Sequence, residues 1–354
     1  MLKSPGENGI VLYGQRRIGK TSVLQQLASL LPQKGPYAPV YFDLQDKAGK
    51  PLDQVLKDLA DTVCYVLGIP EPETLLDDLK DNAEKNFREY FLPKGMSLLP
   101  EKILVLLFDE FDVIGSMGEK QAGKSLFPYI RNLMSRDGGR VKFIFVVGRR
   151  IEDLSSGFLS LFKTIRSRRI SLLSPEDTEA LVRLSEQNDS LKWSKDAVSK
   201  VKEVSGGHPF LTQQLCQVIW DNMYDEEPEE SPTVNVKDVE QAVAEALKTA
   251  ENSLAWLYDG LGHAERVVEA ALAQAGPKAI TQEELEQILQ ESGVRILIGE
   301  LQDAPRVLAD WDLIQPEEGG YRFRVEMLRR WIAQKKPLVD LLKRIYQIRQ
   351  PHRD

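Results

Sequence analysis

The most constraining feature of this 354-residue chain is the segment Gly14-Gln-Arg-Arg-Ile-Gly-Lys-Thr21, which has the spacing of a Walker A loop. An apolar run at residues 10–13 precedes it, and a helical pattern at residues 22–31 follows it. Glycines at both ends let such a loop wrap closely around a phosphate, so that backbone N–H groups and a helix N-terminus face the anion. The flanking strand and helix make this more than a glycine-rich turn with a stray lysine. We therefore expect a strand, a phosphate-binding loop and a helix in succession.

Each side chain of the loop has an expected role toward a nucleotide. Lys20 should reach the β- and γ-phosphates, and Thr21 should ligate Mg²⁺. The sequence leaves three alternatives open for Arg16 and Arg17: contact with the nucleotide, pairing with acidic residues, or exposure to solvent. The expected nucleotide-binding residues of the loop are Gly14, Gln15, Arg16, Arg17, Ile18, Gly19, Lys20, Thr21 and Ser22.

Five apolar runs, rich in β-branched and aromatic residues, alternate with helical patterns along the first half of the chain. They lie at residues 10–13, 40–44, 103–108, 142–147 and 169–172. Strands that alternate with helices favour an α/β domain with a parallel five-stranded sheet covered on both faces. The binding crevice of such a sheet is expected at the carboxyl ends of its strands.

Two acids end the third predicted strand, about ninety residues after the loop. Phe108-Asp109-Glu110 has the hhhhDE pattern of a Walker B motif. Asp109 is expected to hold the Mg²⁺ shell, and Glu110 to orient and deprotonate the attacking water. Glu110 and Lys20 are therefore candidate catalytic residues.

Two further polar residues end neighbouring strands. Arg149 follows the fourth strand, where a guanidinium can distinguish ATP from ADP by contact with the γ-phosphate, so we count it as a catalytic candidate. Arg150 is expected at the surface. Asp43 ends the second strand and either touches metal or water, or initiates a turn.

The second half of the chain has only helical patterns until close to its end. Residues 1–173 are expected to form the nucleotide-binding domain and residues 174–250 a helical lid, whose Gly206-Gly-His-Pro209 opens an apolar helix. Those glycines permit close approach to another surface, and His208 is expected to be structural. Residues 251–354 are expected to form a winged helix followed by a basic C-terminal helix. Its three helices are expected at residues 253–275, after a Thr281–Glu284 capping box and at about residues 296–310, and its two strands about Gly319.

Composition narrows the class of protein further. The chain is 42% apolar and 28% charged, with no run long enough to span a bilayer, so we expect a cytoplasmic protein without membrane contact. Cys64 and Cys216 are expected to be buried free thiols. The net charge is −8, yet residues 319–354 carry ten Lys or Arg against three acids, a local charge of +7.

Together these motifs resemble the STAND class of signal-transduction P-loop ATPases, in the prokaryotic branch close to archaeal ATPases and Orc/Cdc6-like AAA+ proteins. The resemblance covers nearly the whole chain. It is carried by the Walker A segment, Phe108-Asp-Glu-Phe-Asp112, Val147-Gly-Arg149, Gly206-Gly-His-Pro-Phe210 and the terminal segment 321–331.

The resemblance implies an ATP/ADP switch that uses Mg²⁺ and hydrolyses slowly. ADP would clamp the P-loop domain, lid and winged helix together, and exchange for ATP would open them and permit self-association. An effector or sensor protein, of unknown identity, is the implied partner. Pro209 matches the adenine-contacting proline of the family, Arg149 matches its first sensor, and Arg324 falls near its winged-helix contact to the ADP β-phosphate.

Two alternatives remain open. The first is an Orc/Cdc6-like or transposition-type ATPase that binds DNA phosphates through Arg322, Lys335, Lys336, Lys343 and Arg344. The expected groove-facing helix has a net charge of −2, which disfavours that function. The second alternative is a scaffold that binds ATP without hydrolysing it, which an intact Glu110 disfavours.

Overall fold

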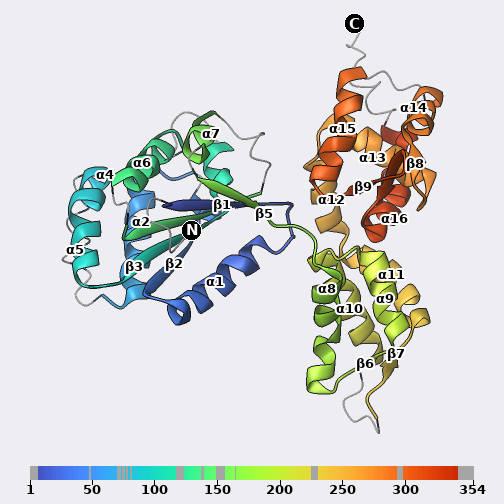
Figure 1. Cartoon of the computed structure of the whole chain (residues 1–354), viewed down its shortest axis with the longest axis horizontal. Coiled ribbons are helices and arrows are strands. Elements are labelled where there is room, and N and C mark those ends of the chain that lie inside the picture. Colours follow the sequence, from blue (N-terminus) through green and yellow to red (C-terminus); the bar gives the residue numbers. More distant parts are fainter. Residues whose placement is uncertain are drawn as a thin grey trace, which may run out of the picture. The chain divides into compact units, whose positions relative to one another are not determined.

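The chain folds into two compact units in the computed structural model (Figure 1). One comprises residues 1–15 and 19–170, and the other comprises residues 16–18 and 171–354. The structure describes residues 7–47, 49–69, 73, 76, 79, 82–116, 123–136, 139–148, 156–163, 165–224, 230–292 and 298–341. The predicted sensor Arg149, its neighbour Arg150, and the tail cations Lys343 and Arg344 lie outside these residues.

The first unit is built on a parallel five-stranded sheet of order β2-β3-β4-β1-β5. Its strands are β1 Gly9–Tyr13, β2 Tyr37–Asp43, β3 Ile103–Asp109, β4 Val141–Val147 and β5 Arg166–Arg169. β3 and β4 are almost wholly buried, as continuous apolar runs predict for central strands. The predicted parallel α/β sheet is confirmed.

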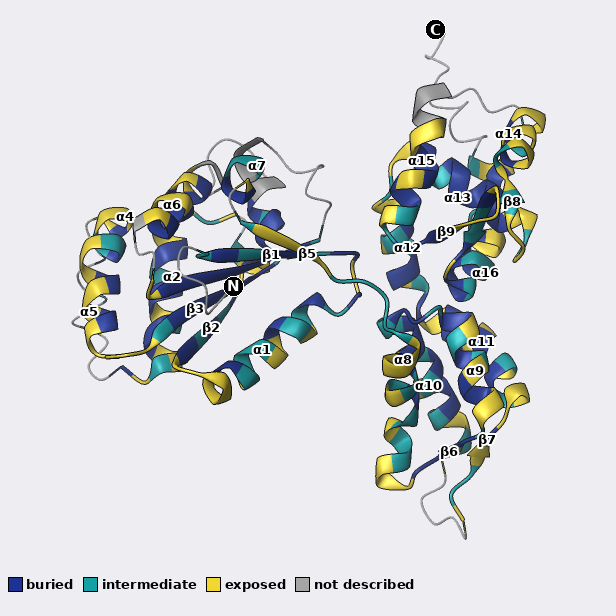
Figure 2. Ribbon diagram, viewed as in Figure 1, coloured by how far each residue is buried: buried dark blue, intermediate teal, exposed yellow. Residues whose placement is uncertain are grey.

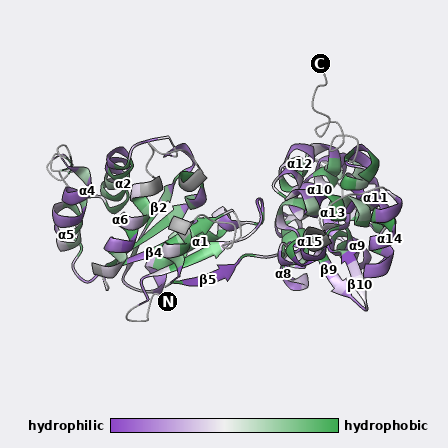
Figure 3. Ribbon diagram, turned by 90° about the horizontal axis from the view of Figure 1, so that it is seen from above, coloured by the Kyte–Doolittle hydropathy of each residue, from purple (hydrophilic) through white to green (hydrophobic). Residues whose placement is uncertain are grey.

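The position of the fifth strand was predicted wrongly. It covers residues 166–169 in place of 169–172, and all four of its side chains are exposed. Figure 3 shows it as a hydrophilic strand at the margin of the sheet. Among the described residues β5 pairs with β1 and stands at the edge of the sheet, where a strand needs no run of apolar residues. The apolar residues on which the prediction rested follow the strand.

Helices cover both faces of this sheet. Their bounds are α1 Lys20–Lys34, α2 Leu52–Leu67, α4 Ala83–Asn86, α5 Leu92–Ser97, α6 Gly123–Arg136 and α7 Ser156–Phe162. Short helical segments lie at η1 Gln45–Lys47, η2 Phe87–Phe91 and η3 Phe111–Ser116.

The two faces differ in what covers them. The P-loop helix α1 packs through Leu24 on one face, against Leu12, Leu107 and Val146. The other helices contribute to a larger aromatic core on the opposite face, where Phe108, Phe143 and Phe145 stack. Alternate residues of β3 and β4 thus serve opposite faces, which fixes the register of the strands. Figure 2 shows the resulting buried sheet.

The second unit is mainly helical. Its helices are α8 Pro175–Val182, η5 Arg183–Asn188, α9 Lys195–Ser205, α10 Pro209–Met223, α11 Val236–Thr249, α12 Glu251–Asp259, α13 His263–Ala275, α14 Gln282–Glu291, α15 Ile298–Asp310 and α16 Glu326–Lys335. Its strands are β6 Lys192–Trp193, β7 Thr233–Val234, β8 Ile280–Thr281, β9 Ile314–Glu317 and β10 Gly320–Phe323.

Two details of this unit differ from the prediction. The single helix expected from residue 253 to 275 is two helices, because the glycines at 260 and 262 interrupt it between α12 and α13. The segment expected to be purely helical contains the β6–β7 pair, whose two-residue strands are too short to give a sequence period. The Thr281–Glu284 capping box and the antiparallel strands about Gly319 are present as expected.

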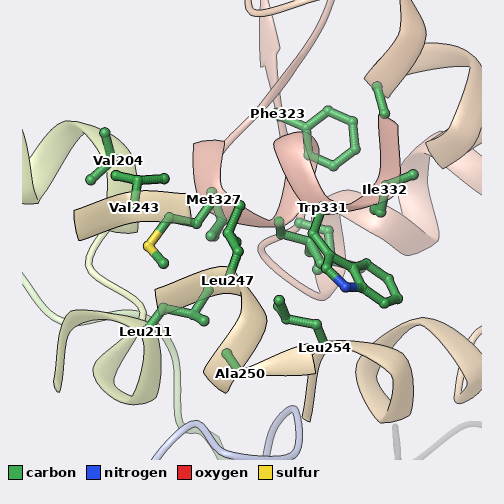
Figure 4. Packing of buried hydrophobic residues seen from close by; sticks show 14 of the residues in the cluster. Val204, Leu211, Val243, Leu247, Ala250, Leu254, Phe323, Met327, Trp331 and Ile332 are labelled. Carbon is green, nitrogen blue, oxygen red and sulfur yellow. The ribbon is translucent and has the colours of Figure 1, made fainter. Parts of the chain in front are cut away.

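One hydrophobic core runs through the second unit. Figure 4 shows Leu211 and Leu247, from helices of the expected lid, beside Met327 and Trp331 of α16. All four side chains are at least nine-tenths buried. The expected boundary at residue 250 therefore passes through a shared core. The division into lid and winged helix stays a prediction.

Two smaller expectations concern the thiols and membrane contact. Cys64 and Cys216 are free, as predicted, but Cys216 is only half-buried. Among the helices that the structure describes, none combines the length and the apolar character needed to cross a membrane.

Candidate functional site

The Walker A segment forms the loop between β1 and α1. Helix α1 begins at Lys20, and Gly19 stands before it with φ +92°, in the left-handed region. A Cβ at Gly19 would meet no atom within 4 Å, so its backbone conformation, and not lack of space, requires glycine. The loop thus leads directly into the first turn of α1, where helix geometry directs backbone N–H groups toward the N-terminal end, as an anion site requires.

Lys20 is held inside the loop. Its Nζ donates to the Gln15 carbonyl oxygen at 2.7 Å, and only 5% of the residue is exposed. The side-chain Oε1 of Gln15 is buried without a hydrogen-bond partner. Gly14 is also buried, Thr21 is half-buried and Ser22 is exposed.

Arg16 and Arg17 are exposed and group with the second unit, together with the buried Ile18. The Arg16 guanidinium lies 5.6 Å from the ring centroid of Trp256, and that of Arg17 lies 5.0 Å from the ring of Phe210. Aromatic faces attract guanidinium groups at such distances. Contact of either arginine with a nucleotide stays a prediction.

Asp109 ends β3 and is 2% exposed. Its Oδ1 accepts a hydrogen bond from the backbone N–H of Glu110, and its Oδ2 accepts one from the Tyr41 hydroxyl, both at 3.0 Å. Burial, together with the negative charge of Asp109, raises the pKa of Tyr41 far above its usual value, so this phenol is a donor at every physiological pH. The predicted Walker B carboxylate is thus fixed through both oxygens.

Glu110 follows in the left-handed region, with φ +49°. Such a backbone conformation is uncommon for a residue other than glycine, and residues that adopt it cluster at functional sites. A Cβ on Gly148, just after β4, would lie 4.0 Å from Oε2 of Glu110 and 3.6 Å from Oδ2 of Asp112. The backbone N–H of Gly148 donates to Oδ1 of Asp112 at 3.0 Å. The ends of β3 and β4 therefore meet around these carboxylates.

Asp43 lies opposite Asp109 in the β2–β3 register, but it is exposed. Its Oδ1 accepts a hydrogen bond from the backbone N–H of Gln45 at 2.9 Å. This is an Asx turn, which agrees with the turn-initiating alternative for Asp43.

The glycines of the Gly-Gly-His-Pro segment lie close against two other backbone segments of the second unit. A Cβ on Gly206 would lie 2.2 Å from the carbonyl oxygen of Arg324, and one on Gly207 would lie 2.7 Å from that of Leu173. Both glycines have positive φ. They permit a close backbone approach, as expected from the sequence.

His208 and Pro209 begin helix α10. His208 is 2% exposed, and burial lowers its pKa to about 4, so it is neutral at physiological pH. Both of its ring nitrogens are buried without a hydrogen-bond partner. Pro209 is half-buried in the first turn of the helix.

Arg324 makes an ion pair with Asp312, with 2.8 Å between Nη1 and Oδ1. The other carboxylate oxygen of Asp312 accepts a hydrogen bond from the Ser171 hydroxyl at 2.6 Å. The Arg324 guanidinium thus has an acidic partner within its own unit. The nucleotide-contacting roles of Arg324 and Pro209 stay predictions.

The donor set of the first unit fits a magnesium–nucleotide complex. The described residues contain no cluster of three or more His, Cys, Asp or Glu that could hold a metal alone. Mg²⁺ is usually held by one or two protein oxygens together with phosphate and water. Thr21 and Asp109 would supply those oxygens, and the loop before α1 would supply the N–H groups for the phosphates.

Two residues of this site were missed by the sequence analysis. Asp112 follows Glu110 by two residues, but nothing in the local sequence indicates that it accepts a hydrogen bond from the backbone N–H of Gly148. Tyr41 lies 68 residues before Asp109, and its role depends on strand order. The sequence did contain one signal for Tyr41. Side chains alternate along a strand, so Tyr41 and Asp43 are expected on the same face of β2.

Comparisons with known proteins agree with this architecture. No family model matches the sequence. A stretch of 125 residues is 27% identical to an uncharacterized ATP-binding protein of Methanocaldococcus jannaschii, covering 30% of this chain and 35% of that protein. The chain thus spans about a third of the length of this curated relative.

Two solved structures share the fold over most of the chain. A Walker-type ATPase of Pyrococcus abyssi superposes with a TM-score of 0.63 and 14% identity, over 92% of this chain and 91% of the other. The ORC2 protein of Aeropyrum pernix, solved in ADPNP and ADP complexes, gives 0.60 and 15%, over 97% and 88%. The chain therefore has a P-loop ATPase fold of the AAA+ type.

Proposed function

We propose that this protein binds ATP and ADP with Mg²⁺ and hydrolyses ATP slowly. One observation carries the proposal: a Walker A loop opens helix α1, and the carboxylates of Asp109 and Glu110 stand at the end of β3 in the same sheet. The 27% identity to an ATP-binding protein supports it.

The residues of the site divide the chemistry among themselves. Lys20 would exchange the Gln15 carbonyl for phosphate oxygens, a charge-assisted contact. Mg²⁺ bound with the nucleotide neutralises charge that develops on the phosphates. Glu110 would orient the attacking water in line with the γ-phosphate and accept a proton from that water.

The finer role is a switch of the STAND type, in which nucleotide exchange controls domain opening, self-association and contact with an effector. Its support is that one chain carries both intact Walker motifs and a second, mainly helical unit. Arg149 as sensor, Pro209 as adenine contact and Arg324 as lock belong to this proposal.

A second candidate function is that of an Orc/Cdc6-like ATPase that binds DNA. The fold likeness to the ORC2 protein of Aeropyrum pernix supports it at least as well as the switch. The charges of the second unit oppose it. Arg322 pairs with Glu317, Lys335 pairs with Glu251, and Lys336 lies over an aromatic ring. Phosphate groups of DNA would have to displace these partners.

Nucleotide binding by a Lys20→Ala variant tests the shared part of both functions. Removal of one charge-assisted hydrogen bond is expected to weaken ATP affinity about 10- to 100-fold. Isothermal titration calorimetry with ATP and MgCl₂ measures the change. Lys34→Ala is the matched control, because Lys34 is exposed in the last turn of the same helix. Equal affinities of the wild type and Lys20→Ala would refute the proposal.

A further inference from the structure

A cross-strand hydrogen bond connects β2 to the Walker B carboxylate. The Tyr41 hydroxyl donates to Oδ2 of Asp109 at 3.0 Å, across 68 residues of sequence. The bond lies wholly within the first unit. Tyr41 lies outside both the Walker A and the Walker B segments.

The strand register explains why these two side chains meet. Tyr41 is paired with Leu107 in the parallel β2–β3 ladder, and Asp109 stands two residues beyond Leu107. Side chains two apart in a strand share a face, so Tyr41 lies on the same face as Asp109. That face is the one that the P-loop helix covers through Leu24, and Tyr41 packs against the same cluster.

The bond removes a freedom that Asp109 would otherwise have. The Glu110 N–H holds Oδ1, and Tyr41 holds Oδ2, so the plane of the carboxylate is set from two sides. Each carboxylate oxygen has two lone pairs, and one hydrogen bond on each leaves capacity for a further donor or a metal shell. Groups that orient a ligand in this way are costly to remove even though they do not touch the metal.

We propose that Tyr41 is a positioning residue that orients Asp109 toward the magnesium shell of the bound nucleotide. This inference rests on the proposed function. Tyr41 acts through Asp109 and touches neither nucleotide nor metal. Its removal should therefore change how strongly Mg²⁺ tightens nucleotide binding, and should leave metal-free binding almost unchanged.

The Tyr41→Phe variant tests the inference, because it removes the hydroxyl and keeps the ring packed. ADP affinity is measured by calorimetry in excess EDTA and then across a MgCl₂ series. The concentration of Mg²⁺ that gives half of the affinity gain should rise about tenfold. Tyr37→Phe is the control, since Tyr37 shares the strand and the face but stands at the opposite end of β2 from Asp43.

A double-mutant cycle separates orientation from packing. In an Asp109→Asn background, Tyr41→Phe should cause no further change in the Mg²⁺ response. A Tyr41→Phe response that overlays the wild type would overturn the inference, and so would an equal loss of affinity in EDTA and in Mg²⁺. If the ADP affinity of the wild type did not depend on Mg²⁺, the proposed function would be overturned, and this inference with it.

Discussion

Several buried side chains have polar atoms without a hydrogen-bond partner, and Glu269 of α13 is the clearest example. It is 1% exposed, and both of its carboxylate oxygens lack a hydrogen-bond partner. Burial raises the pKa of Glu269 to about 8, so the carboxyl is mostly protonated at neutral pH. An uncharged acid is the form that such a site tolerates.

The raised pKa of Glu269 makes stability depend on pH. The folded protein binds more protons than the unfolded chain between pH 4.5 and about 8, so the Glu269 contribution to the free energy of unfolding falls as pH rises through that window. Glu269→Met should flatten this slope and stabilise the protein at pH 8 by about 1–3 kcal/mol. Urea unfolding at several pH values between 6.5 and 9 measures it.

The range above pH 6.5 avoids His208, whose lowered pKa gives a slope of the opposite sign between about pH 4 and 6.5. Glu286→Met, at an exposed site on α14, serves as control and should leave the slope as it is in the wild type. A wild-type slope that survives in Glu269→Met would show that Glu269 does not titrate as described.

At the scale of elements, local patterns predicted most of the helices and strands, and contacts between distant segments supplied the rest. The Walker A loop, β3 and the Thr281 cap each carry a complete local signal, so they could be placed from the sequence. The Tyr41–Asp109 bond could not, because it depends on which strands become neighbours. The arginine-rich β5 was misplaced for a related reason, since an edge strand needs no apolar run.

The close backbone contact between Gly206 and Arg324 can be tested by substitution. Gly206→Ala introduces a methyl group 2.2 Å from the backbone carbonyl oxygen of Arg324. This oxygen belongs to the backbone, so it cannot move aside as the end of a flexible side chain can. We expect a loss of more than about 2 kcal/mol in the free energy of unfolding, of which the left-handed backbone accounts for 1–2 kcal/mol. Thermal or urea unfolding followed by circular dichroism measures the loss.

Gly68→Ala is the matched control for that substitution. Gly68 has nearly the same φ, +61° against +58°, but a Cβ there meets nothing within 4 Å. Gly68→Ala should therefore lose only the backbone contribution. If both variants lost the same stability, the close approach of Arg324 to Gly206 would not be a determinant of the fold.

At the scale of the whole molecule, the chain divides between the sheet domain that carries the Walker residues and a helical unit with one continuous core. That core joins α10 and α11 to α16, and Glu240 of α11 makes ion pairs with Lys200 of α9 and with Arg330 of α16. The helices on both sides of residue 250 therefore share one hydrophobic core. The fold was predictable from the alternating pattern, whereas this shared core was not, because helical periodicity does not reveal which helices meet.

We propose that the site hydrolyses ATP through Glu110, and a comparison of turnover rates tests this proposal. Phosphate release from ATP and MgCl₂ is compared between the wild type and Glu110→Gln, with ATP affinity measured for both. We expect slow turnover by the wild type and a loss of about 100-fold or more in Glu110→Gln, with ATP affinity retained, because this substitution removes the general base. Equal turnover by the two proteins would contradict it.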